Sequence, residues 1–255
     1  MKIIKRNYPA VLMIIIAVIV WESYVKITEI ERYILPAPTQ IFRALVAEWS
    51  VIFPHAIVTF YEALLGFGAA VLVSLILGLI IDSSSFFKRG FYPILVTSQT
   101  IPIIAIAPLF IVWFGFGLLP KVIVVALVAF FPIVINLIDG LNSADHGLVT
   151  LLKTMNASKW QILTKIRLPG ALPAFFSGLR IAATYSVMGA VIGEWFGASK
   201  GLGLYIKNAS NSYLIERFFA ASIVIVATSI LFYGGLLLLE SVIIPWSKKN
   251  DEENA

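Results

Sequence analysis

The chain has 255 residues, of which 60% are hydrophobic and 13% are charged, and its mean hydropathy is +0.94. A water-soluble domain carries about twice this share of charged residues, so the composition excludes that class and indicates an integral membrane protein. The absence of cysteine excludes disulfides, and the two histidines make a histidine metal centre an unfavoured interpretation. We attribute the net charge of +5 to basic loops beside a membrane, and not to nucleic-acid binding.

Six apolar segments are long enough to cross a bilayer, because a spanning helix needs about 20 residues. In chain order they cover residues 9–25, 57–81, 92–114, 118–138, 172–196 and 218–244. The first follows a basic start, like a signal peptide, but no small-residue cleavage pattern comes after it, and we expect it to be retained. The sequence therefore predicts an all-α integral membrane protein with six transmembrane helices in a single membrane domain, residues 1–255.

The basic residues predict the orientation, because cytoplasmic loops are enriched in Lys and Arg. One set of connections, together with both termini, carries most of them: Lys2, Lys5, Arg6, Lys88, Arg89, Lys153, Lys159, Lys165, Arg167, Lys248 and Lys249. The opposite set has fewer basic residues, and four glutamates dilute them. We expect both termini, and the polar stretch between the fourth and fifth spans, to face the cytoplasm.

That polar stretch has a helical pattern. Leu148, Leu151, Leu152 and Met155 fall at i, i+3, i+4 and i+7, which places them on one face of a helix. Asn156 follows, and asparagine often closes a helix in the left-handed conformation. The first half of the stretch therefore predicts a short amphipathic helix that ends at a turn.

A second short helix is predicted directly after this turn. Ser158, with Gln161 three residues later, forms a capping-box pattern at a helix start. We expect this helix to run to Arg167 and to stop before Pro169, because proline disfavours a helical residue in front of it. Two interpretations follow: the helix–turn–helix lies on anionic membrane lipid, or it docks into a groove of a cytoplasmic partner.

The stretch "LLKTMNASKWQILTKIRLPGALP" resembles the cytoplasmic loop of binding-protein-dependent ABC importer permeases. That loop has the pattern Glu-Ala-Ala, three residues, Gly, nine residues, Ile-x-Leu-Pro. The end of the pattern is matched by Ile166, Leu168 and Pro169, whereas residues 150–152 replace Glu-Ala-Ala and Asn156 replaces Gly.

Other stretches resemble one subfamily of these permeases, which contains nitrate, sulfonate and taurine importers and thiamine-precursor and riboflavin-type systems. They are "ILPAPTQIF", "IPIIAIAPLFIVWFGFG", "FFPIVIN" and "GLRIAATYSVMGAVIGEWFGASKGLG", and the resemblance covers residues 34–240.

The resemblance implies a permease subunit in a bacterial cytoplasmic membrane that pairs with a second copy around a pathway. An external binding protein would deliver the solute, and a cytoplasmic ABC ATPase dimer would bind ATP and Mg, so we expect no cofactor on this chain. In agreement, the sequence lacks the phosphate-binding pattern G-x-x-x-x-G-K-[ST]. Residues 145–168 would form the coupling loop, with ATPase contacts at Leu148, Leu151, Leu152, Met155, Asn156, Ala157 and Ser158. The alternatives are a self-sufficient secondary transporter or channel and, more remotely, a membrane enzyme.

Pro102 and Pro108 interrupt the third span, and a broken helix in a membrane is tolerated beside protein or a water-filled cavity. A packing kink is the alternative interpretation. Charged residues inside spans mark a pathway or a buried pair, and for Arg180 we favour a structural role. The candidate pathway residues are Glu62, Ser98, Gln99, Pro102, Tyr185, Ser186, Met188 and Glu194.

The two glutamates lead to a hypothesis about the solute. Glu62 stands where many anion-importing relatives of the resembled subfamily carry Arg. An outer vestibule with Glu62 and Glu194 would have a negative potential that favours neutral or cationic solutes, such as a thiamine pyrimidine precursor or another amino-heterocycle. If Glu62 pairs with a basic residue such as Arg43 or Lys207, this field vanishes, and a sulfonate, taurine or nitrate permease becomes the alternative.

Overall fold

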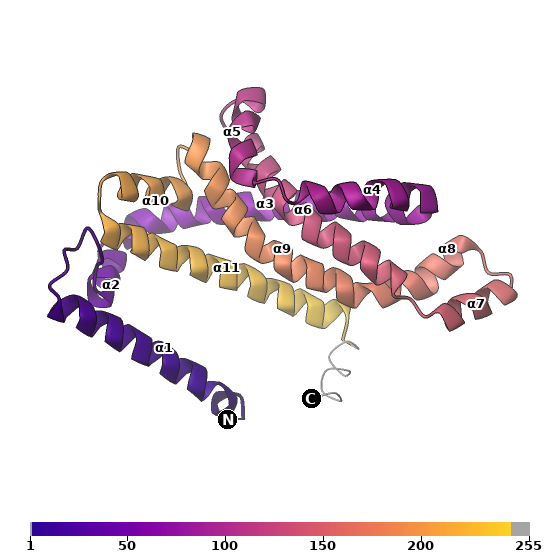
Figure 1. Ribbon diagram of the computed structural model, residues 1–255, viewed down its shortest axis with the longest axis horizontal. Coiled ribbons are helices and arrows are strands. Elements are labelled where there is room, and N and C mark those ends of the chain that lie inside the picture. The colour runs from indigo at the N-terminus through magenta and orange to yellow at the C-terminus, as the bar shows by residue number, and fades with distance from the viewer. Residues whose placement is uncertain (1, 246–255) are drawn as a thin grey trace.

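The computed structural model describes residues 2–245, with side chains from residue 8 onward, and within these residues it contains helices and no strand. Figure 1 labels the elements in chain order. They are α1 (Lys2–Ile27), α2 (Pro38–Ala47), α3 (Trp49–Ser83), α4 (Ser85–Ser98), α5 (Ile103–Phe114), α6 (Leu118–Asn142), α7 (His146–Thr154), α8 (Lys159–Ile162), the π-helix η1 (Leu163–Arg167), α9 (Leu168–Gly197), α10 (Leu202–Asn211) and α11 (Ile215–Ile243).

In the described part of the chain, five helical stretches are long and apolar enough to span a membrane, and α4 with α5 makes a sixth if the bent pair counts as one span. The predicted fold class, all-α with six spans, is confirmed. Helices α2 and α10 lie at one end of the molecule, and α7 and α8 lie at the other (Figure 1). The side chains of Lys2, Lys5 and Arg6, and all of Lys248 and Lys249, lie outside the described residues.

Helix α6 packs against α3 through small residues. On α3, Gly66, Ala70, Ser74 and Gly78 recur every fourth position and are buried. A Cβ at Gly78 would lie 2.7 Å from the Leu137 side chain, and one at Gly66 would overlap Val125. Small residues at this spacing let two membrane helices approach closely, and close contact is the main source of their attraction in lipid.

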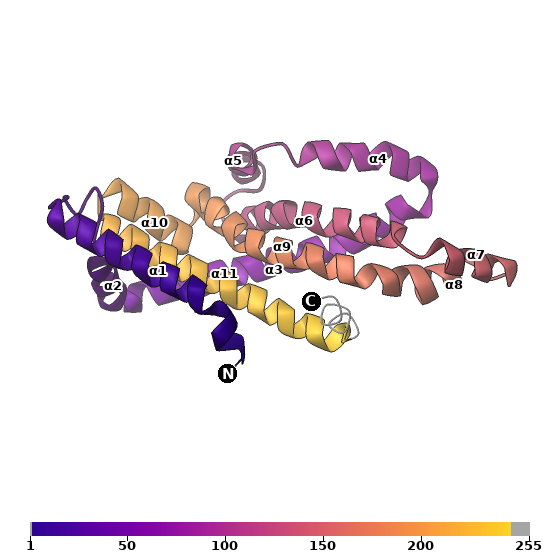
Figure 2. The ribbon, with the colours of Figure 1, turned by 60° about the horizontal axis from the view of Figure 1, so that its bottom comes forward.

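Helix α9 packs on α6 in the same way. A Cβ added at Gly140 of α6 would lie 2.9 Å from the Ala174 side chain, and one at Gly178 of α9 would lie 2.6 Å from the Pro132 carbonyl oxygen. The other helices surround this α3–α6–α9 centre. Figures 1 and 2 show α4 and α5 on one side of it and α1 on the other, where Trp21 lies edge-on to Phe219 of α11.

The third span is broken, as the prolines predict. Helices α4 and α5 meet at an angle of 99°, and Pro102 is the residue directly before α5. Proline has no N–H to donate and keeps the residue before it out of the helical conformation, so a helix ends here readily. Pro108 lies inside α5 without interrupting it.

The helix–turn–helix also forms as predicted. Asn156 has a φ of +57°, and the turn is closed by the Ala157 N–H, which donates to the Leu152 carbonyl at 2.9 Å. Ser158 and Gln161 make the reciprocal capping box, with the Gln161 N–H donating to Ser158 Oγ at 3.2 Å and the Ser158 N–H to Gln161 Oε1 at 2.7 Å.

The predicted helix end before Pro169 is wrong. The chain stays helical from Lys159 to Gly197, because the π-helix η1 precedes the proline. In η1 the Leu168 N–H donates to the Leu163 carbonyl, five residues back. This wider turn accommodates a proline ring that would clash with the i−4 carbonyl of an α-helix, and π-turns of this kind recur at functional sites.

The left-handed turn at Asn156 can be tested by substitution. Asn156→Gly should leave the free energy of unfolding unchanged or slightly raised, because glycine adopts positive φ without strain. Asn156→Val should lower it by about 1–2 kcal/mol, since the branched side chain clashes at positive φ. Thermal unfolding of the purified permease in detergent measures both, and equal midpoints for the two variants would contradict the turn assignment.

Candidate functional site

A cavity of about 720 Å³ lies where the third span breaks. Residues of the α4–α5 break form one wall, and the middles of α6 and α9 form the other. The lining consists of Ser98, Gln99, Thr100, Ile101, Pro102, Ile103, Ile106, Leu127, Val128, Phe131, Pro132, Ile135, Asn136, Ile181, Tyr185 and Met188. Because the α6 and α9 residues are central in their helices, the cavity lies near the middle of the membrane domain.

The polar groups of this lining are uncharged. They are the hydroxyls of Ser98, Thr100 and Tyr185 and the side-chain amides of Gln99 and Asn136. The Asn136 amide nitrogen donates to the Pro132 carbonyl at 2.8 Å, which fixes the side chain. The rest of the lining is aliphatic or aromatic, so the cavity offers neutral hydrogen-bonding groups on apolar walls.

Helix α9 divides into two faces. Ile181, Tyr185 and Met188 are each between 44% and 46% exposed and lie on the cavity side. Ser186 is fully buried on the packed face, and its hydroxyl donates to the Ala182 carbonyl of its own helix at 2.7 Å. Ser186, a predicted pathway residue, therefore does not line this cavity, because it belongs to the small buried residues that pack α9 into the bundle.

The predicted pathway residues fall into two groups. The structure brings Ser98, Gln99, Pro102, Tyr185 and Met188 together around the cavity. Glu62, Ser186 and Glu194 are not part of its lining; each is buried within the helix bundle. Thr100 and Asn136 also line the cavity but were not among the candidate pathway residues, although Thr100 lies two residues before Pro102 and Asn136 four residues after Pro132.

Glu62 forms a buried ion pair with Lys121 of α6. Glu62 Oε1 and Lys121 Nζ are 2.5 Å apart, and the two side chains are 2% and 9% exposed. Lys121, in the first turn of α6, was not among the residues singled out from the sequence, so this partner was missed. The pair corrects the expected negative vestibule, since Lys121 neutralises Glu62. Lys207, a partner considered for Glu62, instead donates to the Trp195 carbonyl at 2.7 Å.

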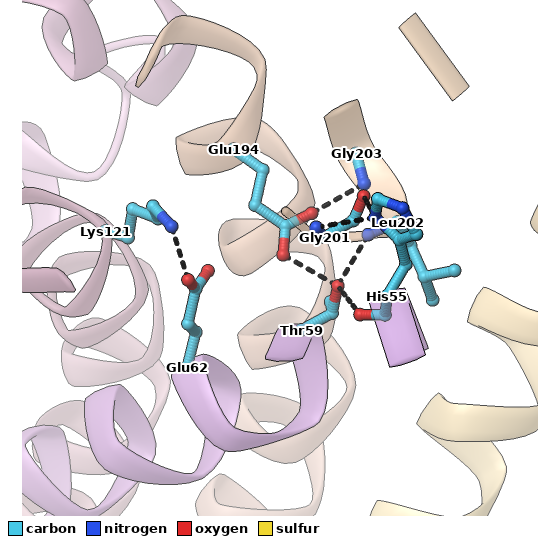
Figure 3. A network of polar contacts seen from close by, with 8 residues as sticks. All are labelled: His55, Thr59, Glu62, Lys121, Glu194, Gly201, Leu202 and Gly203. Carbon is cyan, nitrogen blue, oxygen red and sulfur yellow. Dashed lines mark hydrogen bonds and ion pairs between the residues drawn. The ribbon is translucent and has the colours of Figure 1, made fainter. Parts of the chain in front are cut away.

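Glu194 holds the start of α10 (Figure 3). Its Oε1 accepts the Thr59 hydroxyl at 2.6 Å, and its Oε2 accepts the Gly203 N–H at 2.5 Å. The Thr59 oxygen in turn accepts the Leu202 N–H at 2.8 Å. The first N–H groups of a helix have no partner within it and favour negative charge nearby, so Glu194 and Thr59 together act as its cap.

The turn before α10 is fitted to this network. Gly201 has a φ of +131°, and a Cβ there would overlap the Glu194 carboxyl group. The Gly201 N–H donates to Nδ1 of His55 on α3 at 2.8 Å. The turn therefore requires glycine, and it ties α9 and α10 to α3. At this end of the molecule both glutamates have structural contacts.

Arg180 is paired inside the bundle. Its Nη1 lies 3.0 Å from Glu240 Oε2 on α11, and its Nη2 donates to Ser177 Oγ at 2.9 Å. These contacts support the structural role favoured for Arg180. Glu240 was not singled out from the sequence, because its position near the end of the last span resembles that of an ordinary interfacial acid.

The helix–turn–helix presents apolar side chains to its surroundings. Leu148, Leu151 and Met155 are 49%, 55% and 69% exposed, and Leu152 is half-buried. Trp160 on α8 is 70% exposed and enlarges this surface; an aromatic residue in a polar stretch was the signal that could have identified it. An apolar surface of this kind at the end of the molecule is typical of an interaction site.

The cap of α10 generates a prediction. Glu194→Gln should unfold at nearly the wild-type temperature, because the amide oxygen accepts the Gly203 N–H and the amide nitrogen donates to Thr59. Glu194→Leu should be clearly destabilised, since each buried donor that loses its acceptor costs about 1–3 kcal/mol. Thermal unfolding in detergent tests this, with the exposed Glu31→Leu as control; equal midpoints for Glu194→Leu and Glu31→Leu would contradict the cap.

Comparison with known proteins identifies the family. The family described as binding-protein-dependent transport system inner membrane component matches residues 70–243. The formylaminopyrimidine transport permease protein ThiX of Halalkalibacterium halodurans is 35% identical over 96% of this chain and 99% of its own. The riboflavin transport system permease protein RibX of Chloroflexus aurantiacus is 32% identical over 93% and 89%.

The fold is similar to that of a chain in a solved ABC transporter structure. A crystal structure of an amino acid ABC transporter with histidines contains a chain that superimposes with a TM-score of 0.62 at 18% identity, over 79% of this chain and 98% of that chain. The expectation of an ABC importer permease is confirmed, and the self-sufficient transporter is set aside. The chain belongs to the family of binding-protein-dependent inner membrane components and is the multi-pass permease subunit of an ABC importer, which works with a separate ATPase and a binding protein.

Proposed function

We propose that this permease imports an uncharged or amine-bearing heterocycle, of the kind of a thiamine pyrimidine precursor, through the cavity at the broken third span. Two copies would face each other around the pathway, with both termini and the α7–α8 loop in the cytoplasm. The observation that carries the proposal is the lining itself, which combines side-chain amides and hydroxyls with aliphatic and aromatic walls and no charged group.

The chemistry of the lining supports this solute class. A planar heterocycle with amino or carbonyl groups matches amide and hydroxyl partners and packs against apolar walls. A sulfonate or nitrate would leave water for a cavity without a cation to replace its hydration, at a cost in free energy. The pyrimidine permease of Halalkalibacterium halodurans, similar along nearly its whole length, supports the same class. The proposal no longer rests on Glu62, whose charge Lys121 neutralises.

The apolar surface of α7 and α8 is the proposed ATPase contact. Leu148, Leu151 and Met155 belong to α7 and its C-terminal cap and are 49%, 55% and 69% exposed. Helix α7 lies at the end of the molecule opposite α10 (Figure 1). Leu152, Asn156, Ala157 and Ser158 shape the turn between the two helices. These apolar side chains would be more stable in an apolar groove of a partner than in water, because burial of apolar surface is favourable.

The loop proposal predicts a loss of partner binding. Leu151→Asp should reduce the ATPase that co-purifies with tagged permease by at least about tenfold, because an unpaired carboxylate in an apolar contact costs more than about 1.4 kcal/mol. Leu151 is already exposed, so the variant should fold and insert normally. Thr150→Asp places the same charge on the opposite face of α7 and serves as the matched control.

Wild-type recovery of the ATPase by Leu151→Asp would show that α7 does not make the contact. Equal loss in Leu151→Asp and Thr150→Asp would instead show that the added charge acts without regard to the face.

The solute class is tested on the cognate binding protein. Calorimetric titration should show an aminopyrimidine binding roughly 100-fold more tightly, or about 2.7 kcal/mol, than taurine, an alkyl sulfonate or nitrate. Riboflavin serves as a second, larger heterocycle. Uptake into proteoliposomes that contain the whole transporter should follow the same order. Tight binding of a sulfonate or nitrate alone would overturn the proposed solute and leave the family assignment intact.

A further inference from the structure

Arg167 joins three membrane helices at the end where the α7–α8 loop lies. It is the last residue of η1, and its Nη1 and Nη2 each lie 2.8 Å from one oxygen of Asp82 near the end of α3. Its Nε and Nη2 also donate to the Leu141 carbonyl near the end of α6, at 3.1 and 2.9 Å. Asp82 is 6% exposed and Arg167 is 26% exposed.

This arrangement requires a guanidinium group. Two parallel hydrogen bonds to one carboxylate, with a third partner reached by the remaining edge, match the fixed fork of arginine. The Leu141 carbonyl belongs to the last turn of α6, where backbone oxygens have no partner within the helix. A lysine would keep the positive charge, but as a point charge it could not hold Asp82 and Leu141 in the same geometry.

Arg167 is also the first place where the loop is hydrogen-bonded to the helix bundle through a side chain. Within the described residues, the side-chain hydrogen bonds of residues 145–164 stay inside the loop. Beyond them, η1 leads through Arg167 into α9. Apolar contact with the bundle begins earlier, at Leu163, which packs against the core. Arg167 adds the polar connection, through one anchor on α3 and one on α6.

The π-helix that ends at Arg167 departs from regular α-helical geometry. Its i→i−5 bond is wider than the α-helical bond on either side, and π-turns inside long helices recur at functional sites. The centre of the bundle is different, because α6 and α9 touch there through glycines that leave no space for sliding.

We propose that Arg167 is a positioning residue that passes the movement of the ATPase-docked loop to α3, through Asp82, and so couples ATP hydrolysis to opening of the pathway. The inference rests on the proposed docking of α7 and α8 to the ATPase. It adds that the loop can bind the ATPase fully and still fail to drive transport when this ion pair is broken.

The experiment uses the complete transporter in proteoliposomes. Binding protein and solute are supplied on the side of the membrane from which the transporter imports. Arg167→Lys and Asp82→Asn should each lower the uptake per ATP hydrolysed by roughly tenfold, within the range of couplings carried by single residues. The amount of ATPase that co-purifies, and its rate of hydrolysis, should stay within about twofold of wild type. Lys165→Ala, an exposed cation in the same π-turn, is the matched control and should keep wild-type coupling.

Wild-type uptake per ATP in both Arg167→Lys and Asp82→Asn would overturn the inference. So would loss of ATPase from these variants, because Arg167 would then shape the docking surface. Failure of both variants to give a monodisperse, folded protein would also overturn it, since the pair would then be needed for folding. The docking proposal is judged separately by Leu151→Asp, so either can fail without the other.

Discussion

A helix that ends or bends inside a membrane protein must find protein partners for its free backbone groups, because lipid offers none. This constraint explains where the chain places its polar residues. Glu194 and Thr59 accept the first N–H groups of α10, and Arg167 donates to a last carbonyl of α6. Glu194, Thr59 and Arg167 thus serve as hydrogen-bond partners of helix ends. Their removal would leave backbone N–H or carbonyl groups without a partner.

The cavity follows from the same constraint. The charged groups at Glu62, Lys121, Arg180 and Glu240 neutralise one another in pairs away from the lining. The broken third span exposes neutral hydroxyls and amides to the space between α5, α6 and α9. A neutral lining disfavours ions that carry a tight hydration shell, because it offers no opposite charge to replace their hydration.

Local patterns allowed much of the fold to be predicted, and long-range pairing accounts for most of what was missed. The spans, the break at Pro102, the left-handed Asn156 and the Ser158–Gln161 box depend on neighbours within a few residues, so the sequence contains their cause. Glu62 and Lys121 are 59 positions apart, and Thr59 and Glu194 are 135 apart. Such pairs depend on how each helix is rotated about its axis. The same rotation decides why Tyr185 lines the cavity whereas Ser186, the next residue, is buried against the bundle. The helix end expected before Pro169 failed because a π-turn has no clear sequence pattern.

Helix α9 links the three parts of the molecule. Over 30 residues, or about 45 Å at 1.5 Å per residue, it begins beside the Arg167 anchor, passes the cavity with Tyr185 and Met188, and ends at Glu194 under α10. Its opposite face is fixed to α6 by Gly178 and its neighbours, so the two helices form one rigid unit. If the loop moves as proposed, a rotation that starts there would reach the whole of α9. It would then change the cavity wall, with Tyr185 and Met188, and the contact of Glu194 with α10 together.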